Sequence, residues 1–473
     1  MNKVIRWFSV FVICFGVLFT VPVKPVKASS SFFINSQLDI VDANPGNGVC
    51  ATSTNVCTLR AAIMEANALP GADTIILSPV RYTLLLDGNP SADNDDNSVS
   101  GDLDVTDELT IQVGPTSGKA TIQGRGWTER IIENLTSEGS AGLTLINIII
   151  KTGNSTERGG GLLNTGPAEL INVTIENNVS ASNGGGISST GALTIVNSII
   201  RNNTSNDGTN GGGGIHYVGQ NILTITNTTI SGNTAKNGGG LLVEKNLDAS
   251  GPSIIYGSTF SGNIALSNGG AIFATKNGGV ELVNSTISGN SANNDGGGLY
   301  GHISHETNIR YKLASVTITN NTADADSNGG GNGGGIATNN QPDSIFISKN
   351  TIIAGNFDLS TGSSPVRPDC SLTLTSEGYN LIHQTTGCTI VGDTTGNILG
   401  AFDGLSPLQN WGGLTSTHIP SYGIGLDAGN PNGCTDFQGN LLSDDQIGEP
   451  RHQGHAGIIG VCDIGSVELE QPV

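Results

Sequence analysis

A glycine run followed by an aliphatic residue recurs seven times between residues 159 and 336, and it constrains the fold more than any other feature. Successive runs lie 25, 28, 26, 31, 27 and 37 residues apart, and a second phrase of the type NSTISGN alternates with them. Two motifs that alternate with one shared period are typical of a stacked repeat, and loops of different length account for the variation in spacing. The first phrase ends at Leu162, Ile187, Ile215, Leu241, Ile272, Leu299 and Ile336, and the second at Asn178, Asn203, Asn233, Asn263, Asn290, Asn321 and Asn356.

Each repeat contains short runs of alternating Val, Ile, Leu and Thr, bounded by Gly, Asn or Asp. The repeat GGGLLNTGPAELINVTIENN holds three such runs, and a coil of 25 to 30 residues with three strands predicts a right-handed parallel β-helix. We expect about ten coils. Asn side chains at equivalent places can hydrogen-bond up a stack, and Asn233, Asn263 and Asn290 are the candidates. The alternative is that these residues only make exposed turns.

The composition is unusual for an ordinary globular enzyme, and the N-terminus predicts export. Only 13% of residues are charged and 69 are Gly, whereas globular chains have about 25% charged residues. Residues 1–28 combine Lys3 and Arg6 with an apolar run and predict a secretory signal, the alternative being an uncleaved anchor helix. The predicted signal contains four of the basic residues, so the mature chain has 20 − 4 = 16 basic and 40 acidic residues and a net charge near −24. A negative charge of this size disfavours binding to nucleic acid or anionic lipid. We expect a secreted monomer that needs no cofactor.

Six cysteines remain after the signal, and they fall into three local couples outside the repeat array. In an exported protein such couples predict disulfides that staple the two ends. A zinc site is the alternative, but no CxxC couple exists and no His residues are grouped beside the cysteines. The predicted pairs are Cys50–Cys57, Cys370–Cys388 and Cys434–Cys462.

The domain organisation follows from these features. Residues 29–72 form an N-terminal cap, 73–360 the repeats, and 361–473 the last coils and a C-terminal domain closed by disulfides. Apolar residues recur at helical spacing within residues 58–69, Thr58 is a plausible N-cap, and Pro70-Gly71 ends the helix. An amphipathic helix before a solenoid can cover the apolar end of the first coil.

Three motifs resemble known families. The segment DANPGNGVC…CTLRAAIMEANALPGADTI resembles the CSLREA domain of secreted bacterial β-helix proteins, with Thr58 and Ala61 departing from Ser and Glu. The repeats NSTISGNSANNDGGGLY and STFSGNIALSNGGAIF resemble those of polymorphic outer-membrane proteins and the pectate-lyase-like superfamily. The phrases EGYNLIHQTTGC, GLDAGNP, DDQIGEPR and CDIGSVE resemble the choice-of-anchor Q domain, although no sorting motif precedes Val473. None of these resemblances implies a defined chemistry.

Parallel β-helices host polysaccharide lyases and hydrolases, so a catalytic groove has to be considered. Such sites need convergent carboxylates and a base, yet the acids of the repeats occupy no fixed place in the coil. The insertion GHISHETNIRYK between two repeats holds a cluster of titratable residues. We interpret this insertion as a solvated loop, and the alternative is a catalytic or metal-binding site. The members of the cluster are His302, His305, Glu306, Arg310 and Lys312.

The segment DNDDNSVSGDLD is a calcium candidate. Asp93, Asp95, Asn97 and Asp104 fall at positions 1, 3, 5 and 12 of a calcium loop. Ser98 stands where Gly is expected, and an acidic solvated excursion is the alternative.

The acids Asp427, Asp463 and Glu468 near the C-terminus look catalytic but lie in turn-forming phrases, so we interpret them as structural. The sequence thus predicts a non-enzymatic extracellular or cell-surface protein that binds a glycan or another protein through its long flank. A polysaccharide-active lyase or hydrolase is the alternative.

Overall fold

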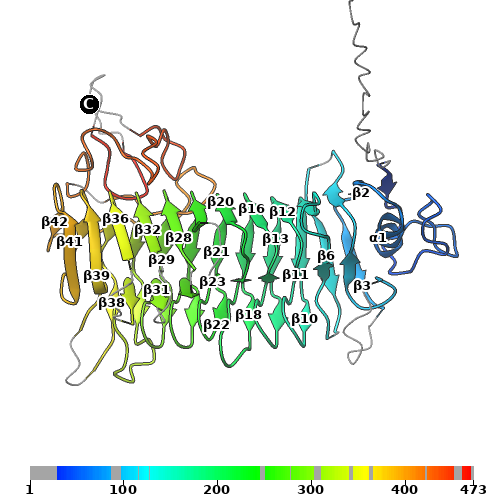
Figure 1. Ribbon diagram of the computed structural model, residues 1–473, viewed down its shortest axis with the longest axis horizontal. Helices are drawn as coiled ribbons and strands as arrows, with labels where there is room; N and C mark the ends of the chain where they lie inside the picture. Colours follow the sequence, from blue (N-terminus) through cyan, green and yellow to red (C-terminus); the bar gives the residue numbers. More distant parts are fainter. Residues whose placement is uncertain are drawn as a thin grey trace, which may run out of the picture.

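The computed structural model describes residues 29–86, 97–115, 117–126, 128–245, 251–276, 278–302, 310–339, 345–361, 366–420, 423–451 and 461–469. The predicted signal, residues 1–28, lies outside this part of the chain. The described chain winds into one elongated parallel β-helix, with the helix α1 (Leu59–Ala68) at one end (Figure 1). Strands of neighbouring coils pair in parallel, so the predicted fold is confirmed.

Four sheets run along the stack, and sheets A and C share the long strand β39. Sheet A contains β1 (Ser31–Phe33), β2 (Asp73–Leu77), β5 (Leu109–Val113), β8 (Leu143–Ile146), β12 (Ala168–Ile171), β16 (Leu193–Val196), β20 (Leu223–Thr226), β24 (Ser253–Tyr256), β28 (Val280–Val283), β32 (Arg310–Ala314), β36 (Ile345–Lys349), β39 (Cys370–Glu377) and β41 (Cys388–Asp393). Sheet C contains β4 (Leu103–Val105), β7 (Ile132–Asn134), β11 (Leu162–Asn164), β15 (Ile187–Ser189), β19 (Ile215–Tyr217), β23 (Leu241–Lys245), β27 (Ile272–Lys276), β31 (Leu299–His302) and β35 (Ile336–Thr338).

The other two sheets complete each coil. Sheet B has 12 strands in the described chain, so the stack is slightly longer than the expected ten coils. Sheet B contains β3 (Arg81–Leu84), β6 (Ala120–Gly124), β9 (Ile148–Lys151), β13 (Thr174–Glu176), β17 (Ile199–Arg201), β21 (Thr229–Ser231), β25 (Thr259–Ser261), β29 (Thr286–Ser288), β33 (Thr317–Thr319), β37 (Ile352–Ile353), β40 (Leu381–Ile382) and β42 (Ile398–Leu399). Sheet D contains β10 (Asn154–Ser155), β14 (Val179–Ser180), β18 (Thr204–Ser205), β22 (Thr234–Ala235), β26 (Ile264–Ala265), β30 (Ser291–Ala292), β34 (Thr322–Ala323) and β38 (Phe357–Asp358).

The repeat phrases become columns of buried residues. The aliphatic residue that ends each glycine phrase opens a strand of sheet C and pairs with its equivalent in the next coil, as Leu162 does with Ile187. These residues are fully buried. Glycine is required before them because a Cβ at Gly213 would come within 2.5 Å of the carbonyl oxygens of Gly239 and Thr234. The run therefore lets the backbones of neighbouring coils approach closely.

The asparagines that end the second phrase form a buried ladder. Each Nδ2 donates to the Oδ1 of its equivalent in the next coil, at 3.0 Å from Asn233 to Asn263 and 2.9 Å from Asn263 to Asn290. The ladder runs from Asn178 to Asn356, and Asn356 donates to Asp369 Oδ1 at 2.8 Å. The predicted stacking is confirmed, and the exposed-turn alternative is wrong because these amides are buried.

The N-terminal cap is held by polar side chains of the predicted helix. The side chain of Thr58 caps α1 by accepting from Ala61 N at 3.1 Å. The buried guanidinium of Arg60 pairs with Asp39 at 2.6 Å and donates to the backbone oxygens of Ser98, Gly101 and Asp102. Glu65 accepts the backbone N–H groups of Gly46 and Gly48. The helix, its cap and the disulfide loop thus form one unit at the end of the first coil.

The cysteines pair as the local spacing predicts: Cys50–Cys57, Cys370–Cys388 and Cys434–Cys462, with Cα separations of 5.2, 5.3 and 5.9 Å. Among the described residues, no helix combines the length and apolar character needed to span a bilayer.

The C-terminal segment, described at 400–420, 423–451 and 461–469, folds back along the flank of the stack beside β28, β32 and β36 (Figure 1). Cys434 and Leu442 pack on Val283 and Ala314 of sheet A. On sheet B, Thr286 Oγ1 donates to Gln446 Oε1 at 2.6 Å, and His418 Nε2 lies 2.7 Å from Ser288 Oγ. The contacts of this segment thus lie on sheets A and B of the later coils.

Candidate functional site

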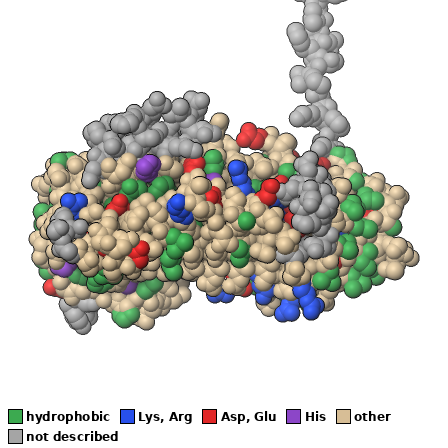
Figure 2. Space-filling view, turned by 90° about the horizontal axis from the view of Figure 1, so that it is seen from below, with side chains coloured by type: hydrophobic (Ala, Val, Ile, Leu, Met, Phe, Trp, Pro, Cys, Tyr) green, Lys and Arg blue, Asp and Glu red, His purple; other side chains and the backbone are tan. Residues whose placement is uncertain are grey.

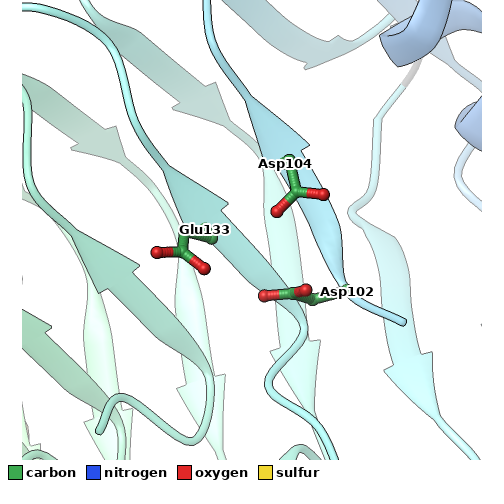
Figure 3. Close-up of side chains that lie close together, drawn as sticks. All are labelled: Asp102, Asp104 and Glu133. Carbon is green, nitrogen blue, oxygen red and sulfur yellow. The ribbon is translucent and has the colours of Figure 1, made fainter. Parts of the chain in front are cut away.

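Three carboxylates converge beside the N-terminal cap (Figure 3). Asp104 in β4 is paired in register with Glu133 in β7, which places the two acids on neighbouring strands, and Asp102 precedes β4. One oxygen from each lies within 4.8 Å of the others. Asp102 and Asp104 are buried, and Glu133 is partly buried. Clustered carboxylate oxygens are the ligands that calcium prefers.

A buried arginine already balances part of this charge. Arg130 Nη1 lies 3.2 Å from Asp102 Oδ2 and 2.5 Å from Glu133 Oε2. The third acid, Asp104, accepts the backbone N–H of Ser98 at 2.7 Å. Because a guanidinium contacts two of the acids, the cluster is first of all a buried ion-pair network, and a bound cation would compete with Arg130.

The predicted calcium loop shares one residue with this cluster. Asp104 belongs to it, whereas Asp93 and Asp95 lie outside the described residues. Asn97 is exposed, and its Oδ1 accepts Val99 N at 3.0 Å in a local turn. The sequence did not indicate Glu133 as a partner because the pairing of β4 with β7 brings it to Asp104. Asp102 lies in the same phrase, two residues before Asp104, but at none of the calcium-loop positions that were matched. An acid at the same place in two successive coils is the signal that could have revealed Glu133.

The insertion candidates are divided between two sheets. His302 ends β31 in sheet C, is exposed, and its ring centroid lies 6.2 Å from that of Phe273. Lys312 is in β32 of sheet A, where Nζ lies 3.7 Å from Glu281 Oε2 and 5.2 Å from the Phe437 ring. His305 and Glu306 lie outside the described residues, and Arg310 begins β32. Lys312 thus contacts the C-terminal segment through Phe437.

A second lysine strengthens this contact. Lys349 Nζ lies 4.6 Å from the centroid of Phe437 and donates to Asp436 O at 2.7 Å. Burial lowers the pKa of Lys349, and the nearby Glu377 opposes that shift. The aromatic ring between two lysines attaches the segment to sheet A.

The acids of the C-terminal segment form a structural network. Asp463 accepts the backbone N–H groups of Asp427 at 2.6 Å and Leu469 at 2.8 Å. Burial, followed by the negative charge of Glu468, raises the pKa of Asp463 to about 7. Buried Arg451 lies 3.5 Å from Glu468 Oε2 and donates to Asn284 Oδ1 and Gly465 O. These contacts support the structural interpretation of Asp463 and Glu468, whereas Asp427 takes part through its backbone N–H.

Comparison with protein families matches the model described as the Chlamydia polymorphic membrane protein (Chlamydia_PMP) repeat at residues 172–190 and 257–275. Each matched stretch spans one strand of sheet B, one of sheet D and one of sheet C. The repeat of the family model therefore corresponds to the same three strands of a coil in both places. Comparison of the sequence with curated proteins gives no match.

Two known structures are similar in fold. The Azotobacter vinelandii mannuronan C-5 epimerase AlgE4 A-module has a TM-score of 0.36 and 13% identity, over 77% of this chain and 96% of that one. Pectate lyase Pel9A has a TM-score of 0.37 and 13% identity, over 94% of this chain and 98% of that one.

Proposed function

We propose that the protein is a non-enzymatic extracellular or cell-surface β-helix protein that binds a glycan or another protein through its long flank. One observation carries this proposal: four acids at or beside the candidate positions are engaged in contacts that hold the fold together. Asp102 and Glu133 contact Arg130, Glu281 contacts Lys312, and Asp463 accepts two backbone N–H groups. A catalytic acid or base must instead reach the proton that it transfers.

The surface of the stack supports a binding function. Neighbouring coils present equivalent side chains at intervals of about 4.8 Å, so a linear ligand can meet the same chemistry repeatedly. The C-terminal segment already uses this surface on the later coils. The earlier coils have the same architecture, and Thr229 of β21 is only partly buried where its partner Thr259 of β25 is buried.

Three disulfides support an extracellular location, because disulfides persist in oxidising compartments. The matched repeat is named for a membrane protein family and is consistent with a cell-surface protein. The resemblances to the CSLREA and choice-of-anchor Q domains remain predictions, as do the signal and the monomeric state.

The test combines binding with turnover. Mature protein is applied to an array of cell-surface glycans and incubated with acidic polysaccharides in millimolar calcium. We expect binding without new reducing ends and without a rise in the absorbance of unsaturated products. Turnover that Asp104→Asn or Glu306→Ala abolishes would favour the polysaccharide-active alternative. Arg158→Gln, an exposed residue after β10, provides the control variant.

A further inference from the structure

The outward face of sheet B in the early coils carries a concentration of positive charge. Six strands form this face: β3, β6, β9, β13, β17 and β21. Their outward residues are Arg81, Thr83, Thr121, Gln123, Ile149, Lys151, Thr174, Glu176, Ile199, Arg201, Thr229 and Ser231; all but the buried Thr174 are exposed or partly buried. Glu176 is the one acid among these twelve residues.

Two further basic residues flank this face, Lys119 before β6 and Arg125 after it. Among the described residues of these strands and their flanks, these two and Arg81, Lys151 and Arg201 give five positive charges against the one negative charge of Glu176, a net +4. The whole chain has a net charge of −20. Figure 2 shows Lys and Arg side chains gathered along the lower edge of the view, on the half of the stack nearer to the N-terminal cap. We call these six charged residues the basic face.

Strand register sets the spacing of the charges. Lys151, Glu176 and Arg201 pair in succession across β9, β13 and β17. Two strand spacings, about 9 to 10 Å, therefore separate Lys151 from Arg201 along the stack axis. Lys119 Nζ donates to Thr174 Oγ1 at 3.0 Å, which places a third cation over β13. Burial, followed by the charge of Arg201, lowers the pKa of Lys119, so these cations share one neighbourhood.

The same face is occupied in the later coils. The outward residues Thr259 of β25, Thr286 of β29 and Thr317 of β33 are buried and contact the C-terminal segment. Thr229 in β21 is paired in register with Thr259 but is only partly buried. On the earlier coils of this sheet the described side chains of Arg81, Arg125 and Arg201 are exposed, and those of Lys119 and Lys151 are partly buried, so a ligand can reach these cations.

We infer that the basic face binds a linear anionic glycan lying along the stack axis, with carboxylate or sulfate groups on its lysines and arginines. Guanidinium groups recognise such planar or branched anions through paired N–H donors. The hydroxyl and amide groups of Thr121, Gln123 and Ser231 can exchange hydrogen bonds with sugar hydroxyls. Arg201 donates from Nε and Nη2 to a single oxygen of Glu176, so Glu176 competes with the ligand for this guanidinium. The inference rests on the proposed glycan binding and specifies its face and ligand charge.

The test uses mature protein and immobilised heparin, polygalacturonate and neutral dextran in biolayer interferometry. We expect binding to one or both anionic glycans, weakening as NaCl rises from 50 to about 300 mM because salt screens exposed charges. The triple variant Arg81→Gln, Lys151→Gln, Arg201→Gln should bind at least tenfold more weakly. Glu176→Gln should bind more tightly, a gain that misfolding cannot produce.

A control variant, Arg158→Gln, Lys236→Gln, Arg367→Gln, also removes three positive charges, but from residues outside the basic face. It should bind like the wild type. Heparin binding without polygalacturonate binding identifies sulfate as the recognised group, and the converse identifies carboxylate. If the triple variant binds as tightly as the wild type, the basic face is not the binding site, although the proposed glycan binding would still stand. Binding to neutral glycans alone would overturn the inference but not the proposed function, and binding to no glycan or protein surface would overturn both.

Discussion

Replacing the central asparagine of the buried ladder tests how the coils are held together. Asn263 is fully buried and Oδ1 accepts both Asn233 N at 3.1 Å and Asn233 Nδ2 at 3.0 Å. Its own Nδ2 donates to Ile230 O and to Asn290 Oδ1, each at 2.9 Å. Asn263→Ala removes these contacts at the centre of three consecutive coils.

The magnitude follows from the groups that are left behind. Two buried N–H donors of Asn233 lose their acceptor, and each unsatisfied buried donor costs about 1–3 kcal/mol. The expected loss is therefore about 2–6 kcal/mol. Since each coil contacts only its neighbours, the effect should be concentrated in the coils that contain β21, β25 and β29.

Native-state hydrogen exchange read by mass spectrometry measures this local loss. Peptides covering β21, β25 and β29 should exchange at least about thirtyfold faster in Asn263→Ala, because 1.4 kcal/mol corresponds to a factor of ten. Peptides covering β8 and β9 should keep the wild-type rate. Asn206→Ala, at an exposed position, is the control and should change stability by less than about 0.5 kcal/mol. Wild-type exchange at β25 in Asn263→Ala would refute the reasoning.

Three further predictions concern pH, metal and covalent structure. Because the pKa of Asp463 is raised to about 7 in the folded protein, above about 3.9 in an unfolded chain, its stabilising contribution is complete below pH 4 and is lost as the pH rises through 7. Limited proteolysis should cut the C-terminal segment faster at pH 8 than at pH 5, and Asp463→Asn should remove that difference; equal rates in the wild type would contradict the shift. Arg130→Gln should lower the melting temperature by leaving the acids beside β4 without their counter-charge, and millimolar calcium should recover part of the loss in this variant more than in the wild type; no recovery would count against a cation site there. Non-reducing peptide mapping should give the three local disulfides, and circular dichroism should show little helix; a bridge between the two ends would be incompatible with the stack.

The sequence by itself determined the repeating part of the architecture. Contacts in a solenoid repeat once per coil, so a residue needed at one place in the coil recurs in the sequence with the period of the coil. This is why the columns beginning at Leu162 and Asn178 could be located from the two phrases. The helix at α1 and the cysteine pairs were equally accessible because their partners lie close together in the sequence.

Only the tertiary structure decided which non-repeating residues meet. Asp104 and Glu133 come together because β4 pairs with β7 across loops of irregular length. Lys312 meets Phe437, and Thr286 meets Gln446, because the C-terminal segment returns along the flank. Thr259 is buried while its register partner Thr229 is not, because that segment contacts the later coil. The sequence contains no period for these contacts: each occurs once, and its position depends on the summed lengths of the loops between the strands.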